Sequence, residues 1–188
     1  TLVADGAIAN YGVSVETADE ALAAIARPGT ATVQIILNAF RLKPLDRVLP
    51  AAREAGVGII ARVPLASGLL SGKYTADTTF AADDHRNYNR HGEAFDVGET
   101  FSGVDFETGV AASQEFAALV PDGLTPAEAA IAWVAQLDGV SSVIPGARSV
   151  AQARANAAAG SAVLPASVTA AVPALYDKYF RAAIHGRW

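Results

Sequence analysis

A turn near the carboxyl end of the chain has the residue types of an anion-binding site. In the run IPGARS, residues 144–149, Gly146 and Arg148 come directly before a segment with helical spacing. Free backbone N–H groups and the dipole at a helix N-terminus attract an anion, and an arginine adds a bidentate contact to a phosphate. A tight strand-to-helix turn with an exposed arginine would have the same pattern, so spacing alone leaves both interpretations open.

A second turn combines small residues with a positive charge. The run PLASGLLSGKY, residues 64–74, places Gly68 and Gly72 around a leucine pair and before Lys73. Glycine permits a close approach of the backbone to a ligand. A flexible loop has a similar composition, so this run taken alone indicates a binding loop only weakly.

Short apolar segments precede these turns, and helical segments follow them. Strands are predicted over 7–13, 32–37, 57–63 and 141–144, and helices over 18–26, 46–55, 106–119, 126–137, 149–159 and 165–180. Asp46 is expected to cap the second helix and Thr125 the fourth, with Pro126 at its first position. Strands that alternate with amphipathic helices predict an α/β fold in which helices cover a parallel sheet.

Two architectures have this order of elements, an open doubly wound sheet and part of a (β/α)₈ barrel. A complete barrel needs roughly 250 residues, so four strand–helix units in 188 residues would make about half of one. In both architectures ligands bind beyond the carboxyl ends of the strands, where the two turns lie. No linker divides the chain, and residues 1–188 are predicted to form one domain.

The composition excludes several classes of protein. A net charge of −5 argues against binding to nucleic acid, because phosphates require a basic surface. The absence of cysteine removes disulfides, thiolate metal sites and cysteine nucleophiles, and suits a reducing cytoplasm. No apolar run approaches the ~18 residues of a membrane span. The chain has no methionine and begins at Thr1, so we expect part of a larger protein.

Taken in order, four strand exits resemble the carboxyl-terminal half of the aldo-keto reductases, which are NADPH-dependent (β/α)₈ barrels. The resemblance lies in GVS at 12–14 for the fifth exit, Gln34 with Asn38 for the sixth, residues 64–74 for the seventh, and 144–149 with Gln152 and Asn156 for the eighth. The seventh has the form found in the bacterial and potassium-channel-β-like branches. The resemblance implies a parallel barrel of TIM type, of which this chain supplies strands five to eight, with a lid-like loop at about 67–105.

The same resemblance implies a binding site for NADPH. Ser14 and Gln34 would hold the nicotinamide carboxamide, and the loop from Leu65 to Lys73 would cover the pyrophosphate. The remaining contacts would come from the last turn and the helix after it. The implied cofactor residues are Ser14, Gln34, Leu65, Ser67, Gly68 and Lys73, together with Gly146 and Arg148 at the 2′-phosphate and Gln152 and Asn156 at the adenine.

Three positions depart from the pattern of the family. Val15 stands where an asparagine usually follows the serine, and Ala155 stands where an acidic residue often precedes the last asparagine. Arg62 occupies the position of an aromatic residue that usually stacks on the nicotinamide. A guanidinium plane can stack on a ring, but it disfavours a cationic one, so Arg62 in that place would favour the reduced cofactor.

The polar stretch at 83–91 is interpreted as part of the lid. If it folds over bound NADPH, Arg86 is expected to reach a phosphate. Its histidines and aspartates could also suggest a divalent metal, but their spacing matches no helical ligand pair, so no metal ligand is assigned. Phe95 and Phe101 are expected to pack the lid against the domain, with lining of a carbonyl pocket as the alternative, and Trp133 is expected to lie in the core.

No residue of the chain is assigned a catalytic role. The catalytic Asp, Tyr, Lys and His of the family lie on its first four strands, and none of the five tyrosines of this chain matches the motif of the acid tyrosine. The resemblance therefore implies an NADPH-dependent reductase of aldehydes or ketones, in which this chain carries the cofactor half and is inactive alone. The alternative is a non-catalytic half-barrel that binds a nucleotide or assembles with itself. The expected partners are a small carbonyl substrate and either the amino-terminal half of the barrel or a second copy, with no nucleic acid and no membrane.

Overall fold

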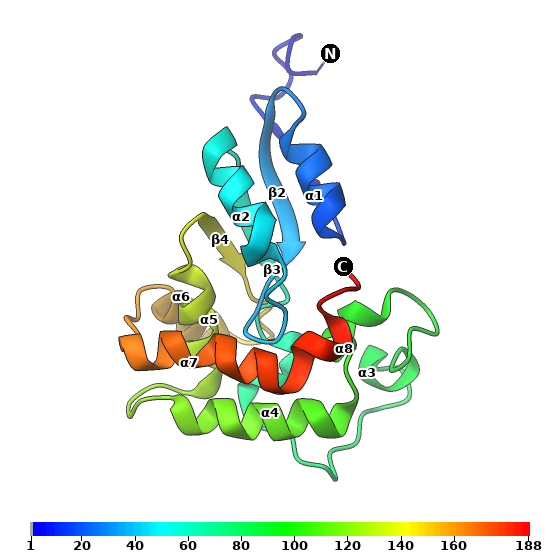
Figure 1. Ribbon diagram of the computed structural model, residues 1–188, viewed down its shortest axis with the longest axis vertical. Helices are drawn as coiled ribbons and strands as arrows, with labels where there is room; N and C mark the ends of the chain where they lie inside the picture. The colour runs from blue at the N-terminus through cyan, green and yellow to red at the C-terminus, as the bar shows by residue number, and fades with distance from the viewer. Residues whose placement is uncertain (1) are drawn as a thin grey trace.

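The strands form one parallel sheet in which they lie in chain order. The computed structural model describes residues 2–188, and Figure 1 shows the strands beside the helices that follow them. Each strand pairs in parallel with the next one along the chain. A doubly wound sheet would reverse its order at a switch point, so this order favours the barrel type of sheet. The strands are β1 (Tyr11–Ser14), β2 (Thr30–Ile36), β3 (Gly58–Arg62) and β4 (Val140–Ile144).

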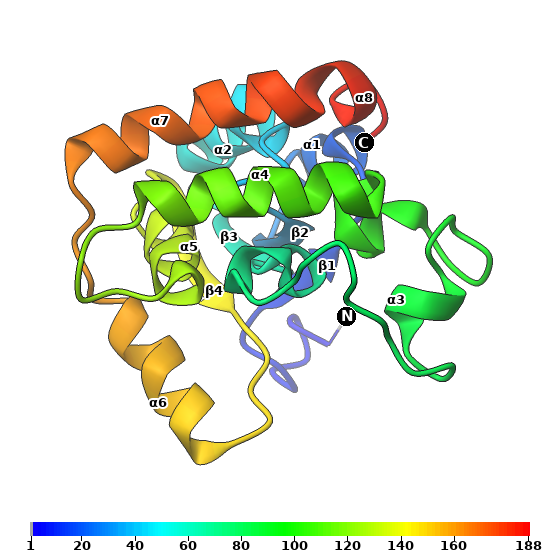
Figure 2. The same cartoon turned by 90° about the horizontal axis from the view of Figure 1, so that it is seen from below.

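The helices fall into two groups. Figure 2 shows α1, α2 and α5 around one side of the row of strands, whereas a doubly wound fold would cover both faces. In both figures α4 and α7 lie side by side, across the end of the sheet toward which the strands point. The main helices are α1 (Ala18–Ile25), α2 (Pro44–Ala55), α4 (Phe106–Leu119), α5 (Pro126–Ala135), α6 (Val150–Ala159) and α7 (Ala166–Tyr176).

The sheet buries one face and leaves the other open. Side chains alternate along a strand, and Val33, Ile35, Ile59 and Ala61 all point into the fully buried core. Their neighbours on the opposite face, such as Gln34, are only partly covered. The open face is therefore the one that a closed barrel would turn inward.

Capping residues position several helices as expected, with one exception. Thr125 caps α5 in a reciprocal pair with Glu128, and Pro126 is the first helical residue. The prediction for Asp46 was wrong, because α2 already begins at Pro44. Proline has its dihedral preset for the first helical position, so Asp46 lies in the first turn instead of before it.

Residues 67–105, here called the lid, are compact and contain only short helical turns. The turns are Ala66–Ser71, α3 (His85–Tyr88), Val97–Glu99 and Phe101–Gly103. Phe101 is fully buried, as expected, against Phe80 and Phe106. Trp133 is likewise in the core.

The chain ends in a tail that returns to the lid. After α7 come a π-helical turn, Asp177–Arg181, and α8 (Ala182–Ile184). Trp188 is 8% exposed.

Among residues 2–188, no helix combines the length and the hydropathy that crossing a membrane requires.

Candidate functional site: a groove at the strand exits

Two adjoining cavities lie beyond the carboxyl ends of β3 and β4. One, the lid chamber, has a volume of about 460 Å³ and includes His85 and Glu99 of the lid. The other, the helix chamber, has a volume of about 290 Å³ and is bounded by the first turn of α5 and by α6. Leu65 and Gly146 line both chambers, so the two form one continuous groove. Seven predicted cofactor residues line it: Leu65, Ser67, Gly68, Lys73, Gly146, Gln152 and Asn156.

The helix chamber is shaped by hydrogen bonds between residues that are close in sequence, within 146–156. The side-chain oxygen Oε1 of Gln152 accepts from the backbone N–H of Arg148 at 2.7 Å, and Asn156 Nδ2 donates to the carbonyl of Gly146 at 3.1 Å. Ser149 caps α6 through the N–H of Gln152. The turn is thereby held open toward solvent, with the exposed Arg148 beside the chamber rather than in its wall.

The loop after β3 is held in an unusual backbone conformation. Val63, Ala66 and Ser67 all have positive φ, at 55°, 48° and 57°, which side-chain-bearing residues rarely adopt. Gly68 has φ 96°, and a Cβ there would lie 2.3 Å from the Tyr74 hydroxyl. Strained backbone of this kind clusters at ligand-binding sites, and here it lies along the groove.

Ser67 joins the two ends of the lid. Its hydroxyl donates to the carbonyl of Glu99 at 2.9 Å and accepts from the N–H of Phe101 at 3.1 Å. The side chain predicted to meet the pyrophosphate is therefore engaged within the protein. Ser67 lines the lid chamber in this arrangement.

Ser14 and Gln34 lie side by side in the sheet. They are direct partners in the pairing of β1 with β2, and Gln34 Nε2 donates to Ser14 Oγ at 3.0 Å. Neither residue lines one of the two chambers. They lie on the open face, on the strands that precede β3 in the sheet.

Arg62 lies between two carboxylates that the sequence did not connect with it. Its guanidinium forms ion pairs with Glu16, which follows β1, and with Glu99 of the lid. The Arg62 side chain is only 12% exposed. Burial raises the pKa of the Glu16 carboxyl, although the charge of Arg62 opposes this rise. The ion pairs connect the lid to the mouth of the sheet.

Arg86 is engaged inside the lid rather than in the groove. Its Nε donates to Asp84 Oδ1 at 2.8 Å, and its guanidinium lies 4.7 Å from the centre of the Phe80 ring. It also bonds the hydroxyl of Tyr74. Hydrogen bonds from Arg86 lower the pKa of Asp84 to about 2. The structure thus gives Arg86 a structural partner and no place in the walls of the groove.

The groove includes two residues that sequence reasoning did not identify, His85 and Glu99. His85 Nδ1 lies 3.6 Å from Asp84 Oδ1. Glu99 is 37 residues from Arg62 in the chain. No local spacing indicates such a pair, since it forms only when the lid folds back.

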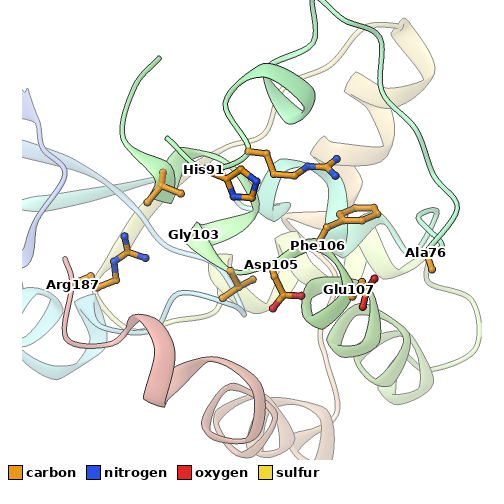
Figure 3. Close-up of a pocket in the computed structure, with 10 residues that line it drawn as sticks. Ala76, His91, Gly103, Asp105, Phe106, Glu107 and Arg187 are labelled. Atoms are coloured by element: carbon orange, nitrogen blue, oxygen red, sulfur yellow. The ribbon is translucent and has the colours of Figure 1, made fainter. Parts of the chain in front are cut away.

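A larger cavity, of about 640 Å³, lies elsewhere, between the lid, the start of α4 and the tail. Figure 3 shows His91 of the lid and Arg187 of the tail on one side of it, with Asp105, which caps α4, and Glu107 in the first turn of α4 nearby. None of the predicted cofactor residues lines it. Because parallel α/β folds bind ligands at the strand exits, the groove is the better candidate site.

Comparisons with known proteins identify the family of the chain. A family model described as "Aldo/keto reductase family" matches residues 1–177. The chain is 34% identical over 121 residues to a probable voltage-gated potassium channel subunit beta of Arabidopsis thaliana, covering 62% of this chain and 34% of that protein. It is 28% identical over 181 residues to the aldo-keto reductase str7 of Strobilurus tenacellus, covering 94% of this chain and 51% of that protein.

Solved structures show the same relationship. A glycerol dehydrogenase from Gluconobacter oxydans superposes with a TM-score of 0.74 at 27% identity, covering 95% of this chain and 52% of that one. The holo form of an aldo-keto reductase from Bacillus halodurans has a TM-score of 0.71 at 20% identity, covering 99% and 55%, and it supports the fold alone. The chain thus spans a third to about half of the length of these relatives.

Proposed function

From the premise that the chain belongs to the aldo/keto reductase family, we propose that its groove binds NADPH. The chain would serve a protein that reduces an aldehyde or ketone to an alcohol. The observation that supports this proposal most is that seven residues assigned to the cofactor line one continuous groove. All seven lie on the turns after β3 and β4 or at the chamber that α6 borders, where ligands of parallel α/β folds bind.

The shape of the groove suggests how the cofactor would lie in it. The adenosine would occupy the helix chamber, where the amides of Gln152 and Asn156 offer polar edges to a purine. Arg148, beside that chamber, would meet the 2′-phosphate with a charge-assisted contact. The pyrophosphate would follow the loop from Leu65 to Lys73.

The nicotinamide would then lie at the lid chamber, toward β1 and β2. Ser14 and Gln34 form a bonded pair on that side, and such a pair can hold a carboxamide. Bound NADPH would supply a hydride to the carbonyl carbon of the substrate. The residues of this chain would bind and orient the cofactor and exclude water from it.

We further propose that the proton donor comes from outside these 188 residues. The chain spans about half of the solved relatives, and its sheet corresponds by resemblance to strands five to eight of the barrel. The catalytic residues of the family lie on the first four strands. The chain alone is therefore expected to bind the cofactor without steady turnover of an aldehyde.

The partner of this sheet is proposed to be another four-stranded half. In the sheet, β1 and β4 are both edge strands, and unpaired edges tend to pair with further strands. The amino-terminal half of the barrel or a second copy of the chain would supply them. A self-assembling, non-catalytic nucleotide-binding module is the alternative that the same edges support.

The lack of cysteine suits a cytoplasmic location.

Calorimetric titration with NADPH tests the proposed function. The chain is expected to bind NADPH, and Lys73→Ala, which removes a cation from the helix chamber, should weaken binding about tenfold. Lys178→Ala is the matched control, because Lys178 pairs with Glu115 outside the groove and its loss should leave the affinity unchanged. A chain that binds no NADPH, or one that binds it equally well without Lys73, would contradict the proposal.

A further inference from the structure

Arg62, near the lid chamber, is not an unpaired positive charge. Arg62 is paired with both Glu16 and Glu99. Its Nη2 also lies 3.4 Å from the carbonyl of Val15. A single guanidinium therefore has two carboxylate partners, so the positive charge of Arg62 is fully offset when both are ionised.

Two further charged groups belong to the same cluster. Arg41 is 2% exposed; its Nη2 donates to the carbonyl of Glu16 at 2.9 Å, and its guanidinium stacks on Trp188. Asp96 accepts from the indole N–H of Trp188 at 2.9 Å. Two arginines and three carboxylates give the cluster a net charge of −1 when all five groups are ionised.

Glu99 is the member of this cluster that borders the groove. Among residues 2–188, it alone of the five lines the lid chamber, and its side chain is 27% exposed. Arg41 is buried beneath the lid, with Trp188 against it. The other titratable group in the chamber wall is His85, which faces Asp84.

We infer that Glu99 is a specificity-determining residue that makes the groove favour the oxidised, cationic nicotinamide over the reduced, neutral one. The inference rests on the proposed function, which places the nicotinamide at the lid chamber. A carboxylate at the edge of a partly buried site attracts a positive ring and has no such attraction for a neutral ring. This preference is opposite to the one expected for an unpaired Arg62.

Glu16 acts on the ring through Arg62, as a positioning residue. It binds the guanidinium from the side of β1 while Glu99 binds it from the lid. With Glu16 present, Arg62 is neutralised without using the whole charge of Glu99. Without Glu16, the pair of Arg62 and Glu99 would have no net charge, and the preference for the cationic ring should weaken.

The test compares the dissociation constants of NADP⁺ and NADPH at pH 8 by isothermal titration calorimetry. Glu99→Gln is expected to raise the ratio of the NADP⁺ constant to the NADPH constant on the order of tenfold. Glu16→Gln should raise the ratio by a smaller factor, and Glu99→Asp should keep it near the unmodified value. Glu93→Gln is the matched control. Glu93 is an exposed lid carboxylate outside the cluster, and its Oε2 accepts a hydrogen bond from the backbone N–H of His91.

The ratio separates electrostatics from structure. A variant that merely loosens the lid weakens both forms of the cofactor equally, and their ratio stays constant. An unchanged ratio in Glu99→Gln and Glu16→Gln, with both forms still bound, overturns the inference and leaves the proposed function intact. If the unmodified chain binds neither form, the proposed function falls and the inference with it.

Discussion

The two ends of the groove are built in different ways. At the helix chamber the shaping hydrogen bonds join residues close in sequence, such as Arg148 with Gln152 and Gly146 with Asn156. At the lid chamber they join distant residues. There the lid is connected to β3 through Arg62 and Glu99, 37 positions apart, and to the tail through Asp96 and Trp188, 92 positions apart.

The ends also differ in burial and charge. Most of α6, which borders the helix chamber, is exposed. At the lid chamber the two arginines of the cluster are well covered, and burial lowers the pKa of Arg41 to about 10. An open polar end suits recognition of a group by direct contact, whereas a charged end would set the electrostatic field at the proposed position of the nicotinamide ring. Substitutions at the two ends should therefore change different measured quantities.

The largest effect is expected from Trp188→Ala, which would remove the contact between the tail and the lid. A Cβ on Gly98 or Gly103 would lie 2.6 Å or 2.4 Å from the indole ring, so the lid backbone rests directly on it. Truncating a buried tryptophan costs about 3 kcal/mol. We expect that loss in denaturant unfolding, together with faster amide hydrogen exchange at residues 96–103.

A lid residue outside this contact provides the control for Trp188. Phe95 is 41% exposed, so Phe95→Ala should change the free energy of unfolding by much less. If Trp188→Ala left both the unfolding free energy and the exchange of residues 96–103 as they were, the tail would not hold the lid.

At the helix chamber, Gly146 and Arg148 could be singled out from the sequence because they come directly before a helical segment, whereas Gln152 and Asn156 were assigned through the resemblance to the family. Gly146, Gln152 and Asn156 lie within eleven positions of one another, and a turn followed by a capped helix specifies their geometry. The glycines of the loop from Leu65 to Lys73 indicated a binding loop only weakly, and its assignment to the pyrophosphate came from the same resemblance. In these segments, residues that are close together in the sequence also lie close together around the groove.

The charged cluster beside the lid chamber could not be predicted in this way. Glu16 and Glu99 stand in segments that look like solvated turns, and only the folding of the lid brings them to Arg62. Trp188 is the last residue, where a sequence gives no sign of burial. The expectation that Arg62 would favour the reduced cofactor therefore left out the two carboxylates that pair with it.

Pairing explains a further difference between sequence and structure, at the first strand. The apolar pattern predicted a strand over 7–13, but β1 comprises Tyr11–Ser14. Its pairing begins with Tyr11 opposite Thr30, which is the first residue of β2. Residues before Tyr11 have no neighbouring strand to bond with, so apolar composition alone does not make them part of the sheet.

At the open end of the groove, Arg148→Ala should weaken NADPH binding about tenfold, the loss typical of one charge-assisted hydrogen bond. Binding of NADH, which has no 2′-phosphate, should be unaffected. Arg154→Ala, on the exposed surface of α6, is the control with the same change of charge. Calorimetric titrations with both cofactors make the comparison. Equal weakening of NADPH and NADH would show that Arg148 does not contact the 2′-phosphate.

The smallest effect is expected inside the lid, at Asp84. Its folded-state pKa of about 2 lies below the ordinary value of 3.8, first through hydrogen bonds from Arg86. A lowered pKa stabilises the fold above the ordinary value, and this stabilisation is lost as the pH falls from about 4 to about 2. Discounted for the solvent screening of a pair whose side chains are each 21% exposed, it is about 1 kcal/mol.

Asp84→Asn isolates this charge, because asparagine caps a helix as well as aspartate does and Asp84 caps α3. Urea unfolding should show the variant less stable than the unmodified chain at pH 7, with the difference shrinking toward pH 2. Asp83→Asn, one residue away, is the control for the general effect of removing a negative charge from the lid. A difference that stayed constant from pH 7 to pH 2 would assign the effect of Asp84 to packing, and the ion pair with Arg86 would then contribute nothing to holding the lid in shape.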